Sequence, residues 1–253
     1  MKKVMIKADS VCKSFVNHGN QNHVLDMIDL DIYEQDFTVI MGSSGAGKST
    51  LLYVLSAMDR PTSGTIRYLD MEISTGKEKE LANIRANEFG FVFQQTHLVS
   101  NLTLFENVIV TGYLNKKKRP KEIRERAEML LKQMNVGDAS HRLPFQVSGG
   151  EAQRAAIARA MINEPGILFA DEPTGALNKR NSEDVLNLLT KLNEQGQSIV
   201  MVTHDLHAAI RATRLLYLED GKILDEMRLP AFEESMSRNR EAQVTAWLTS
   251  LAW

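Results

Sequence analysis

Apolar and polar residues alternate near the start of the chain. The alternation runs through Val4 to Val11 and again through Val24 to Tyr33, which is typical of strands in an antiparallel or mixed sheet. Further on, the pattern consists of short apolar runs bounded by turn residues, and these runs predict additional strands. The predicted additional strands are residues 65–69, 90–94, 167–170, 199–203, 215–218 and a segment after Gly221.

Helical spacing of the apolar residues begins after residue 95, over 104–110, 121–134 and 150–161. The pattern therefore predicts an α/β core, residues 1–94 and 166–230, interrupted by a mainly helical insert at about 95–165. Near the end, Val244, Trp247, Leu248 and Leu251 recur at helical spacing. We expect an amphipathic helix at about 238–253, with its apolar face packed on its own domain.

The composition narrows the class of protein without changing this picture. The 253 residues are 43% hydrophobic and 25% charged with a net charge of −2, which is ordinary for a soluble globular protein and gives no sign of nucleic-acid binding. One α/β domain is expected. A single cysteine, Cys12, excludes a disulfide within the chain and favours a reducing cytosol. No apolar run approaches the length of a membrane helix, so a membrane role would require a partner.

Candidate chemistry begins with the sequence GSSGAGKST at 42–50, which fits the phosphate-loop pattern G-x-x-x-x-G-K-[ST]. An apolar run precedes it and a helical pattern follows at 49–58, as the motif requires. An ordinary glycine-serine surface turn would not explain Lys48 directly after Gly47. We expect Lys48 to contact the β- and γ-phosphates of a nucleotide and Ser49 to ligate Mg²⁺. The candidate binding residues of the loop are Gly42, Ser43, Gly45, Gly47, Lys48, Ser49 and Thr50.

A second candidate lies in GILFADEP at 166–173, an apolar strand that ends in two carboxylates. The strand places Asp171 at the carboxyl edge of the sheet beside the phosphate loop, where it can hold Mg²⁺. Glu172 is a candidate general base for the attacking water, or a group that orients this water. The alternative is a solvated acidic strand end before a proline turn.

A third candidate is VSGGEAQR at 147–154, in which Ser148, Gly149 and Gly150 open a helix. Free N–H groups, a hydroxyl and the helix dipole form a device for binding anions. Since one nucleotide already has its phosphates held by Lys48, a second cradle predicts a head-to-tail dimer that shares the nucleotide. A simple N-cap would explain Ser148 but not the double glycine.

Together, these motifs resemble those of an ATP-binding-cassette (ABC) nucleotide-binding domain, in the order typical of that family. The resemblance implies a P-loop NTPase (RecA-like) α/β core with an antiparallel β subdomain and an inserted α-helical subdomain, and it implies ATP and Mg²⁺ as cofactors. By the same resemblance, Gln94 senses the metal and the attacking water, and His204 contacts the γ-phosphate and stabilises Glu172. Phe15 matches the aromatic that stacks on adenine, although core packing is its alternative role.

The resemblance also implies partners. The segments FVFQQTHLVSNLTLFENV and ADEPTGAL resemble the branch that serves macrolide export, lipoprotein release, cell-division signalling and bacitracin-type antimicrobial-peptide resistance. We therefore expect an ATPase at the cytoplasmic face of the cell membrane. It would dimerise with a second nucleotide-binding subunit, expected to be another copy of this chain, and drive an integral-membrane permease. The alternatives are a DNA-associated relative, a translation-associated relative, or an ABC ATPase for a different substrate class. The first would need a long coiled-coil insertion and the second would normally carry two cassettes, and this sequence shows neither feature.

The sequence departs from the family pattern in three places, one of which, Val147 and Glu151 beside the double glycine, removes no phosphate-facing group. Asn178 stands where an aspartate is usual, so an amide replaces a charge expected to bridge two subunits. We expect altered turnover with dimerisation intact. Gln35 and Asp36 occupy a turn where glycine is usual, which raises a question about local backbone strain and none about chemistry.

Overall fold

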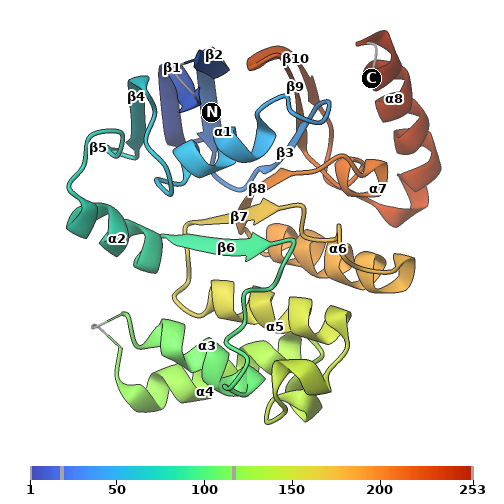
Figure 1. The fold of residues 1–253 in the computed structure, drawn as a ribbon. Coiled ribbons are helices and arrows are strands. Elements are labelled where there is room, and N and C mark those ends of the chain that lie inside the picture. Colours follow the sequence, from blue (N-terminus) through green and yellow to red (C-terminus); the bar gives the residue numbers. More distant parts are fainter. Residues whose placement is uncertain (1, 18–19, 116–117, 252–253) are drawn as a thin grey trace. The chain divides into compact units, whose positions relative to one another are not determined.

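The computed structural model describes residues 2–17, 20–115 and 118–251 (Figure 1). The chain divides into two compact units. The first unit consists of Met1–Leu81 and Asn193–Trp253, and the second unit consists of Ala82–Leu192. Each unit contains strands and helices, so the prediction of an α/β chain is confirmed.

An antiparallel sheet forms the first layer of the first unit, with the strand order β2-β1-β4-β5 (Figure 1). The alternating pattern has its physical cause here, because Ile28, Leu30 and Ile32 stand at every second position of β2 and are buried. The predicted strands are confirmed, and the first two are longer than expected. The strands are β1 (Val4–Asn17), β2 (Asn20–Tyr33), β4 (Ser63–Tyr68) and β5 (Met71–Glu72).

The first unit also contains strands in the order β10-β9-β3-β8, in which β3 is parallel to both β8 and β9. All residues of β3 and β8 are buried, which explains why these strands appear in the sequence as continuous apolar runs. The helix α1 (Lys48–Leu55) follows β3 and buries four apolar side chains. The strands are β3 (Phe37–Met41), β8 (Ser198–Val202), β9 (Arg214–Glu219) and β10 (Lys222–Arg228).

The C-terminal helix α8 (Ser237–Ser250) packs on α7 (Leu206–Ala209) within the first unit. Val244 and Leu248 are fully buried, and the indole Nε1 of Trp247 donates to Asp225 Oδ2 at 2.8 Å. The expectation of a helix whose apolar face packs on its own domain is confirmed for the described residues. The last two residues of the predicted segment lie outside them.

The second unit contains two parallel strands and a group of helices (Figure 1). Helices α3, α4 and α5 contact one another, and α5 also packs on β6. The predicted strands and helices of this region are confirmed. They are β6 (Phe89–Phe93), β7 (Ile167–Asp171), α3 (Leu104–Gly112), α4 (Pro120–Gln133) and α5 (Gly149–Met161), with single 3₁₀ turns at Gly137–Ala139 and Pro144–Gln146.

The short elements α7 and β5 are not among the predicted elements, and neither are two further helices, inside both of which the division between the units falls. These two helices are α2 (Glu78–Asn87) and α6 (Lys179–Glu194). In α6, Val185, Leu189 and Leu192 recur at helical spacing and are buried. This spacing is a usable helix signal that the sequence analysis missed.

The loop at 99–103 is fastened to α3 by one buried amide, Asn107. Its Oδ1 accepts a hydrogen bond from Val99 N at 2.7 Å, and its Nδ2 donates to the carbonyl oxygens of Val99, Leu102 and Thr103 at 3.2, 3.0 and 3.0 Å. The side chain thereby fixes the loop that leads from β6 into α3. Of the helices that the structure describes, none combines the length and apolar character needed to cross a membrane.

Candidate nucleotide-binding and hydrolysis site

The glycine-rich loop of the first unit follows β3 directly and ends at α1. Two of its glycines are required by geometry. Gly42 has φ 152° and a Cβ there would lie 1.9 Å from the carbonyl oxygen of Leu218, while Gly47 has φ 101° and a Cβ there would lie 2.7 Å from the carbonyl oxygen of Val24. The loop therefore lies against both β9 and β2, and a side chain at either position would push it away.

The cation of Lys48 lies inside the loop. Its Nζ donates to the carbonyl oxygens of Gly42 and Ser43 at 2.9 and 2.7 Å. The hydroxyl of Ser43 donates to Glu219 Oε1 at 2.8 Å, and this bond is the main reason why the pKa of Glu219 lies below its ordinary value. Glu219 is a neighbour of the loop that the sequence analysis missed, since it belongs to none of the motifs.

His204 leaves the sheet at the same edge as the loop. Ile40 of β3 lies opposite Val202 of β8, and the N–H of Thr203 donates to the carbonyl oxygen of Ile40 at 3.2 Å. His204 and Gly42 each follow two residues after this pair and therefore emerge together, as parallel strands require. The side chain of His204 is exposed.

Phe15 lies in β1, near the end of the strand, and 44% of its surface is exposed. This exposure does not fit the alternative of core packing. The Nζ of Lys13 lies over the ring, 4.9 Å from its centroid. An aromatic face held at the surface can stack on a nucleotide base.

In the second unit, the register of β6 and β7 brings three predicted residues to one edge. Phe93 lies opposite Asp171, so Gln94 and Glu172 are the first residues beyond the paired ends. Glu172 has φ 46°, a left-handed conformation that is uncommon for glutamate and is a form of backbone strain often found at functional sites. The strand ends therefore present two carboxylates and an amide together.

Gln94 packs against Gly175, the third residue after Glu172. A Cβ at Gly175 would lie 2.9 Å from Gln94 Nε2 and 3.2 Å from its Cδ. The turn carrying Gly175 is closed by its own N–H, which donates to the carbonyl oxygen of Glu172 at 3.0 Å. The absence of a side chain at Gly175 therefore lets the Gln94 side chain pack directly against the backbone of this turn. None of the sequence motifs predicts this contact.

Helix α5 holds the segment around Gln94 from the other direction. Gln153 is buried and its Nε2 donates to the carbonyl oxygen of Phe93 at 2.9 Å. Arg159 donates to the carbonyl oxygens of Thr96 and His97, both at 2.7 Å. One helix thus anchors the backbone on both sides of Gln94.

The start of α5 is a complete capping box. Ser148 Oγ accepts from Glu151 N at 3.2 Å, and Glu151 Oε2 accepts from Ser148 N at 2.8 Å and from Ser148 Oγ at 2.7 Å. The two hydrogen bonds that Glu151 Oε2 accepts from Ser148, from its backbone N–H first and from its hydroxyl second, lower the pKa of Glu151. Ser148 is therefore an N-cap, as the simpler alternative predicts.

The two glycines of this segment differ in their surroundings. A Cβ at Gly150 would lie 2.5 Å from Asn181 Cγ, so a side chain there would have to displace the Asn181 side chain of α6. A Cβ at Gly149 would meet only Leu177 Cδ2, at an ordinary 3.6 Å. Packing inside the chain therefore favours glycine at position 150, whereas no contact with the described residues calls for glycine at position 149.

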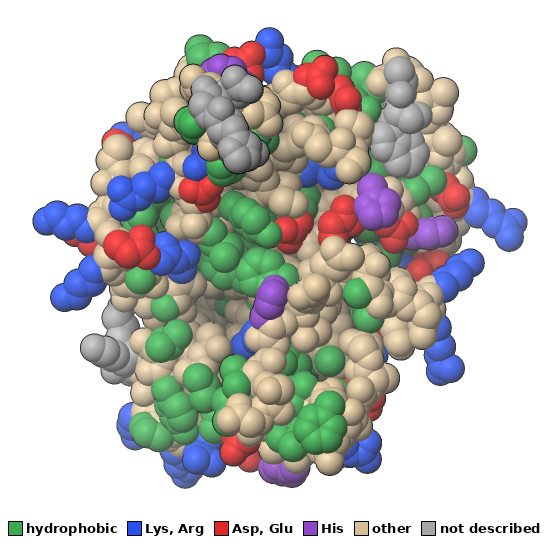
Figure 2. Space-filling view, in the orientation of Figure 1, with side chains coloured by type: hydrophobic (Ala, Val, Ile, Leu, Met, Phe, Trp, Pro, Cys, Tyr) green, Lys and Arg blue, Asp and Glu red, His purple; other side chains and the backbone are tan. Residues whose placement is uncertain are grey.

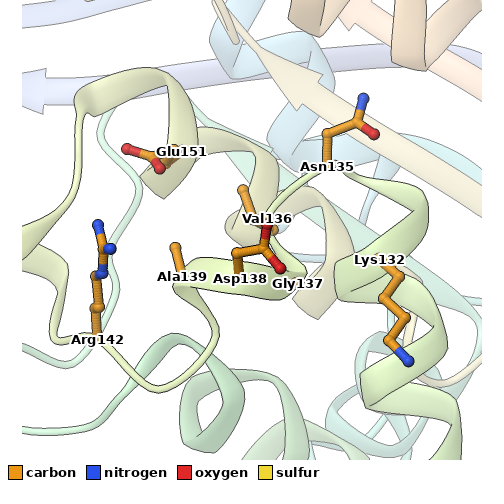
Figure 3. A pocket seen from close by; sticks show the side chains of 8 residues that line it. All are labelled: Lys132, Asn135, Val136, Gly137, Asp138, Ala139, Arg142 and Glu151. Atoms are coloured by element: carbon orange, nitrogen blue, oxygen red, sulfur yellow. The ribbon is translucent and has the colours of Figure 1, made fainter.

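A pocket of about 380 Å³ lies beside the start of α5. Its charged side chains are of both signs and come from separate segments, with Arg142 and Glu151 on one side and Lys132 on the other (Figure 3). Because charges of both signs line the pocket, the lining favours neither an anionic nor a cationic ligand. The lining residues are Lys132, Asn135, Val136, Gly137, Asp138, Ala139, Arg142 and Glu151.

The parallel strands, the glycine loop after β3 and the carboxylates at the strand ends define a P-loop nucleotide-binding protein of the α/β class. A family model described as ABC transporter matches residues 25–175. The chain belongs to the ABC transporter family.

Named relatives and solved structures agree with this assignment. The lipoprotein-releasing system ATP-binding protein LolD of Aquifex aeolicus is 47% identical over 81% of this chain and 91% of LolD. The macrolide export ATP-binding/permease protein MacB of Wolinella succinogenes is 40% identical over 93% of this chain but only 36% of MacB, so this chain spans about a third of that protein. The dimeric ATP-binding cassette MJ0796 bound to ADP and Pi is 38% identical, with a TM-score of 0.83 over 90% of this chain and 100% of that one.

The expected fold class, an ABC cassette of the P-loop NTPase type, is thereby confirmed. The chain is an ATP-binding ABC ATPase. The roles of the individual site residues stay predictions and are developed below.

Proposed function

We propose that this chain binds and hydrolyses ATP as the motor subunit of a membrane transporter, and that two copies close around two Mg²⁺·ATP. Two segments of the chain that each suit a phosphate carry the proposal. One is the loop around Lys48, and the other is the start of α5, where Gly149 has no packing reason to be glycine. A second device is useful when it covers a nucleotide bound by a partner.

The chemistry assigned to each residue follows from its type and surroundings. Lys48 binds the β- and γ-phosphates by exchanging the loop carbonyl oxygens, its present acceptors, for phosphate oxygens. Glu172 is the general base, or orients the attacking water, and His204 stabilises charge on the γ-phosphate. Phe15 stacks on adenine.

The residues also suit Mg²⁺. Ser49, Asp171 and Gln94 offer a hydroxyl, a carboxylate and an amide oxygen, which are the hard oxygen ligands that Mg²⁺ prefers. Register places Asp171 at the paired strand end with Gln94 immediately beyond it. Bound Mg²⁺ would neutralise charge that develops on the transferred phosphoryl group.

The start of α5 is suited to the γ-phosphate of a partner's nucleotide. The N–H groups of its first turn and the helix dipole favour an anion. The Ser148 hydroxyl donates to Glu151 in the free chain, so it can turn to a phosphate oxygen while Glu151 keeps its bond to the Ser148 N–H. Residues 1–253 act as one nucleotide-binding domain in this proposal, with the core at 1–94 and 166–230 and the helical insert at about 95–165.

An integral-membrane permease is the proposed partner, at the cytoplasmic face of the cell membrane. Hydrophobic side chains are visible over the region of α3 and α4 (Figure 2). On or directly after these helices, Val110, Tyr113, Leu114 and Met129 are 41–60% exposed. Apolar surface of this kind fits a protein interface. The relatives LolD and MacB carry names for lipoprotein release and macrolide export, and we propose that this chain serves a permease of that branch.

Three variants test the nucleotide chemistry. Lys48→Ala should abolish ATP binding. Glu172→Gln should keep binding but lower the hydrolysis rate by about 10²–10⁴-fold, the usual contribution of a general base. Glu194→Gln, an exposed carboxylate on α6, is the control and should hydrolyse normally. A Glu172→Gln protein that hydrolyses at the normal rate would remove Glu172 from its role.

Dimerisation has a separate test at Gly149. A Cβ at position 149 would make only one ordinary contact with the described residues, so a side chain fits there. An acidic residue in the first turn of α5 is also compatible with the helix dipole. In the Glu172→Gln background, ATP should convert monomer to dimer in gel filtration, and Gly149→Asp should prevent this while ATP still binds. Gly149→Ala is the matched control without charge. Dimer formation by Gly149→Asp would contradict the shared site.

The permease is tested by copurification of the tagged chain from membranes. Recovery of a multi-helix membrane protein supports the transport role. Recovery of ribosomes or DNA instead would favour the non-transport members of the family.

A further inference from the structure

Phe15 is supported by a buried cation that no nucleotide-binding motif includes. Lys13 is 9% exposed, and its Nζ lies over the Phe15 ring at 4.9 Å from the centroid. An ammonium group within about 6 Å of a ring centroid is attracted to the aromatic face. One face of the ring is therefore occupied from inside the chain.

The Lys13 side chain is also fixed at its charged end. Its Nζ is 2.7 Å from Asp59 Oδ2 and donates to the carbonyl oxygen of Arg60 at 2.7 Å. Three groups thus surround one ammonium, namely a carboxylate, a carbonyl oxygen and an aromatic face. The lysine cannot leave the ring without breaking two charge-assisted hydrogen bonds.

The backbone of β1 is fastened to the same segment. The N–H of Thr62 donates to the carbonyl oxygen of Cys12 at 2.8 Å, and the N–H of Ser14 donates to Thr62 Oγ1 at 2.9 Å. Residues 59–62 follow shortly after α1, whose first turn carries Lys48. The exposed ring and the phosphate loop are therefore parts of one braced framework within the first unit.

We infer that Lys13 is a positioning residue for nucleotide-base binding: its ammonium holds one face of Phe15 and leaves the opposite face to stack on adenine. The inference rests on the proposed function, because it deepens the role of Phe15. A cation behind the ring also draws its electron density away from the open face, which strengthens stacking with an electron-rich purine. Lys13 contributes to affinity for the base and not to contact with the phosphates.

The test compares two ligands that differ only by adenosine, namely Mg²⁺·ADP and Mg²⁺·pyrophosphate, with the full-length chain. Direct calorimetric titration measures ADP, and competition against a fluorescent nucleotide measures pyrophosphate. Lys13→Met should raise the Kd for ADP by about two- to tenfold, the range of a cation–π contact, and leave the Kd for pyrophosphate unchanged. Lys13→Arg, which keeps the cation, should restore the affinity for ADP.

Two further variants separate the possible outcomes. Lys7→Met removes a half-exposed lysine of the same strand, which pairs with Asp9, and should change neither Kd. Phe15→Leu should weaken ADP binding alone. If Phe15→Leu has no effect on ADP, the proposed base site is wrong. If Phe15→Leu weakens ADP binding and Lys13→Met does not, only the inference about Lys13 is overturned.

A structural role for Lys13 in the phosphate loop would give a different pattern. Loss of pyrophosphate binding by Lys13→Met in parallel with ADP would show that the lysine supports the whole fold, and this result would also overturn the inference. Should Lys13→Met fail to fold, Asp59→Asn weakens the hold on the ammonium and keeps the lysine. The Kd for ADP should then rise and that for pyrophosphate should not, and equal changes would refute the inference.

Discussion

Replacing Gly175 by alanine should impair hydrolysis through Gln94 and leave the fold intact. The new Cβ would lie 2.9 Å from Gln94 Nε2, so the amide must retreat by about 0.5 Å to reach an ordinary contact of 3.4 Å. The obstacle is the flexible end of a side chain, which can move. Gly175 is not in the left-handed region, so alanine can adopt its backbone conformation and the free energy of unfolding should change by less than about 1 kcal/mol.

The functional cost follows from the size of this displacement. A reacting group misplaced by 1 Å can lower a rate about 10²-fold, so a shift of half that size should lower kcat about tenfold. Phosphate release at saturating ATP measures kcat, and repeating it across Mg²⁺ concentrations tests the metal role of Gln94. The Gly175→Ala protein should need more Mg²⁺ for half-maximal rate.

A double-mutant cycle identifies the route of the effect. In a Gln94→Ala background the side chain that must move is absent, so Gly175→Ala should cause no further loss. A tenfold loss that persists in the Gln94→Ala background would refute the reasoning. So would a Gly175→Ala protein with the wild-type rate.

Two other predictions concern asparagines. Asn107→Ala removes the buried amide that pairs with the backbone of residues 99–103 and should lower the free energy of unfolding in urea by about 1–3 kcal/mol. Exposed Asn83→Ala should change it by less than about 0.5 kcal/mol, and an equally small loss at Asn107 would contradict the anchoring role. Asn178 Oδ1 accepts from Asn181 N at 3.0 Å and caps α6, so Asn178→Asp should keep stability, since the two residues cap equally well, and raise the ATPase rate if a charge there bridges subunits. An unchanged rate would count against that hypothesis.

Patterns that depend on nearest neighbours could be predicted from the sequence. The buried strands β3 and β8 are apolar throughout, and the phosphate loop requires glycine wherever the backbone approaches another strand. Gln35, at a turn where glycine is usual, has φ 62°, which is the left-handed region that favours glycine. These features are encoded locally, and periodicity and turn chemistry are sufficient to find them.

Contacts between distant segments could not be predicted in this way. Glu219 is 176 residues from Ser43 and reaches it only because β9 pairs with β3. Lys13 looks like an ordinary strand lysine until Asp59 is placed beside it. Such pairs depend on strand order, and a single sequence contains no periodic signal for them.

The geometry of α5 also has a mechanical meaning. Its 13 residues make a rod of about 20 Å, with Ser148 at one end and the anchors of Gln153 and Arg159 along its side. Rigid secondary elements can carry coupling between distant sites, so a displacement at Ser148 would reach the backbone at 93–97 through the hydrogen bonds of Gln153 and Arg159. The helix thus links its N-terminal serine to the backbone on both sides of Gln94.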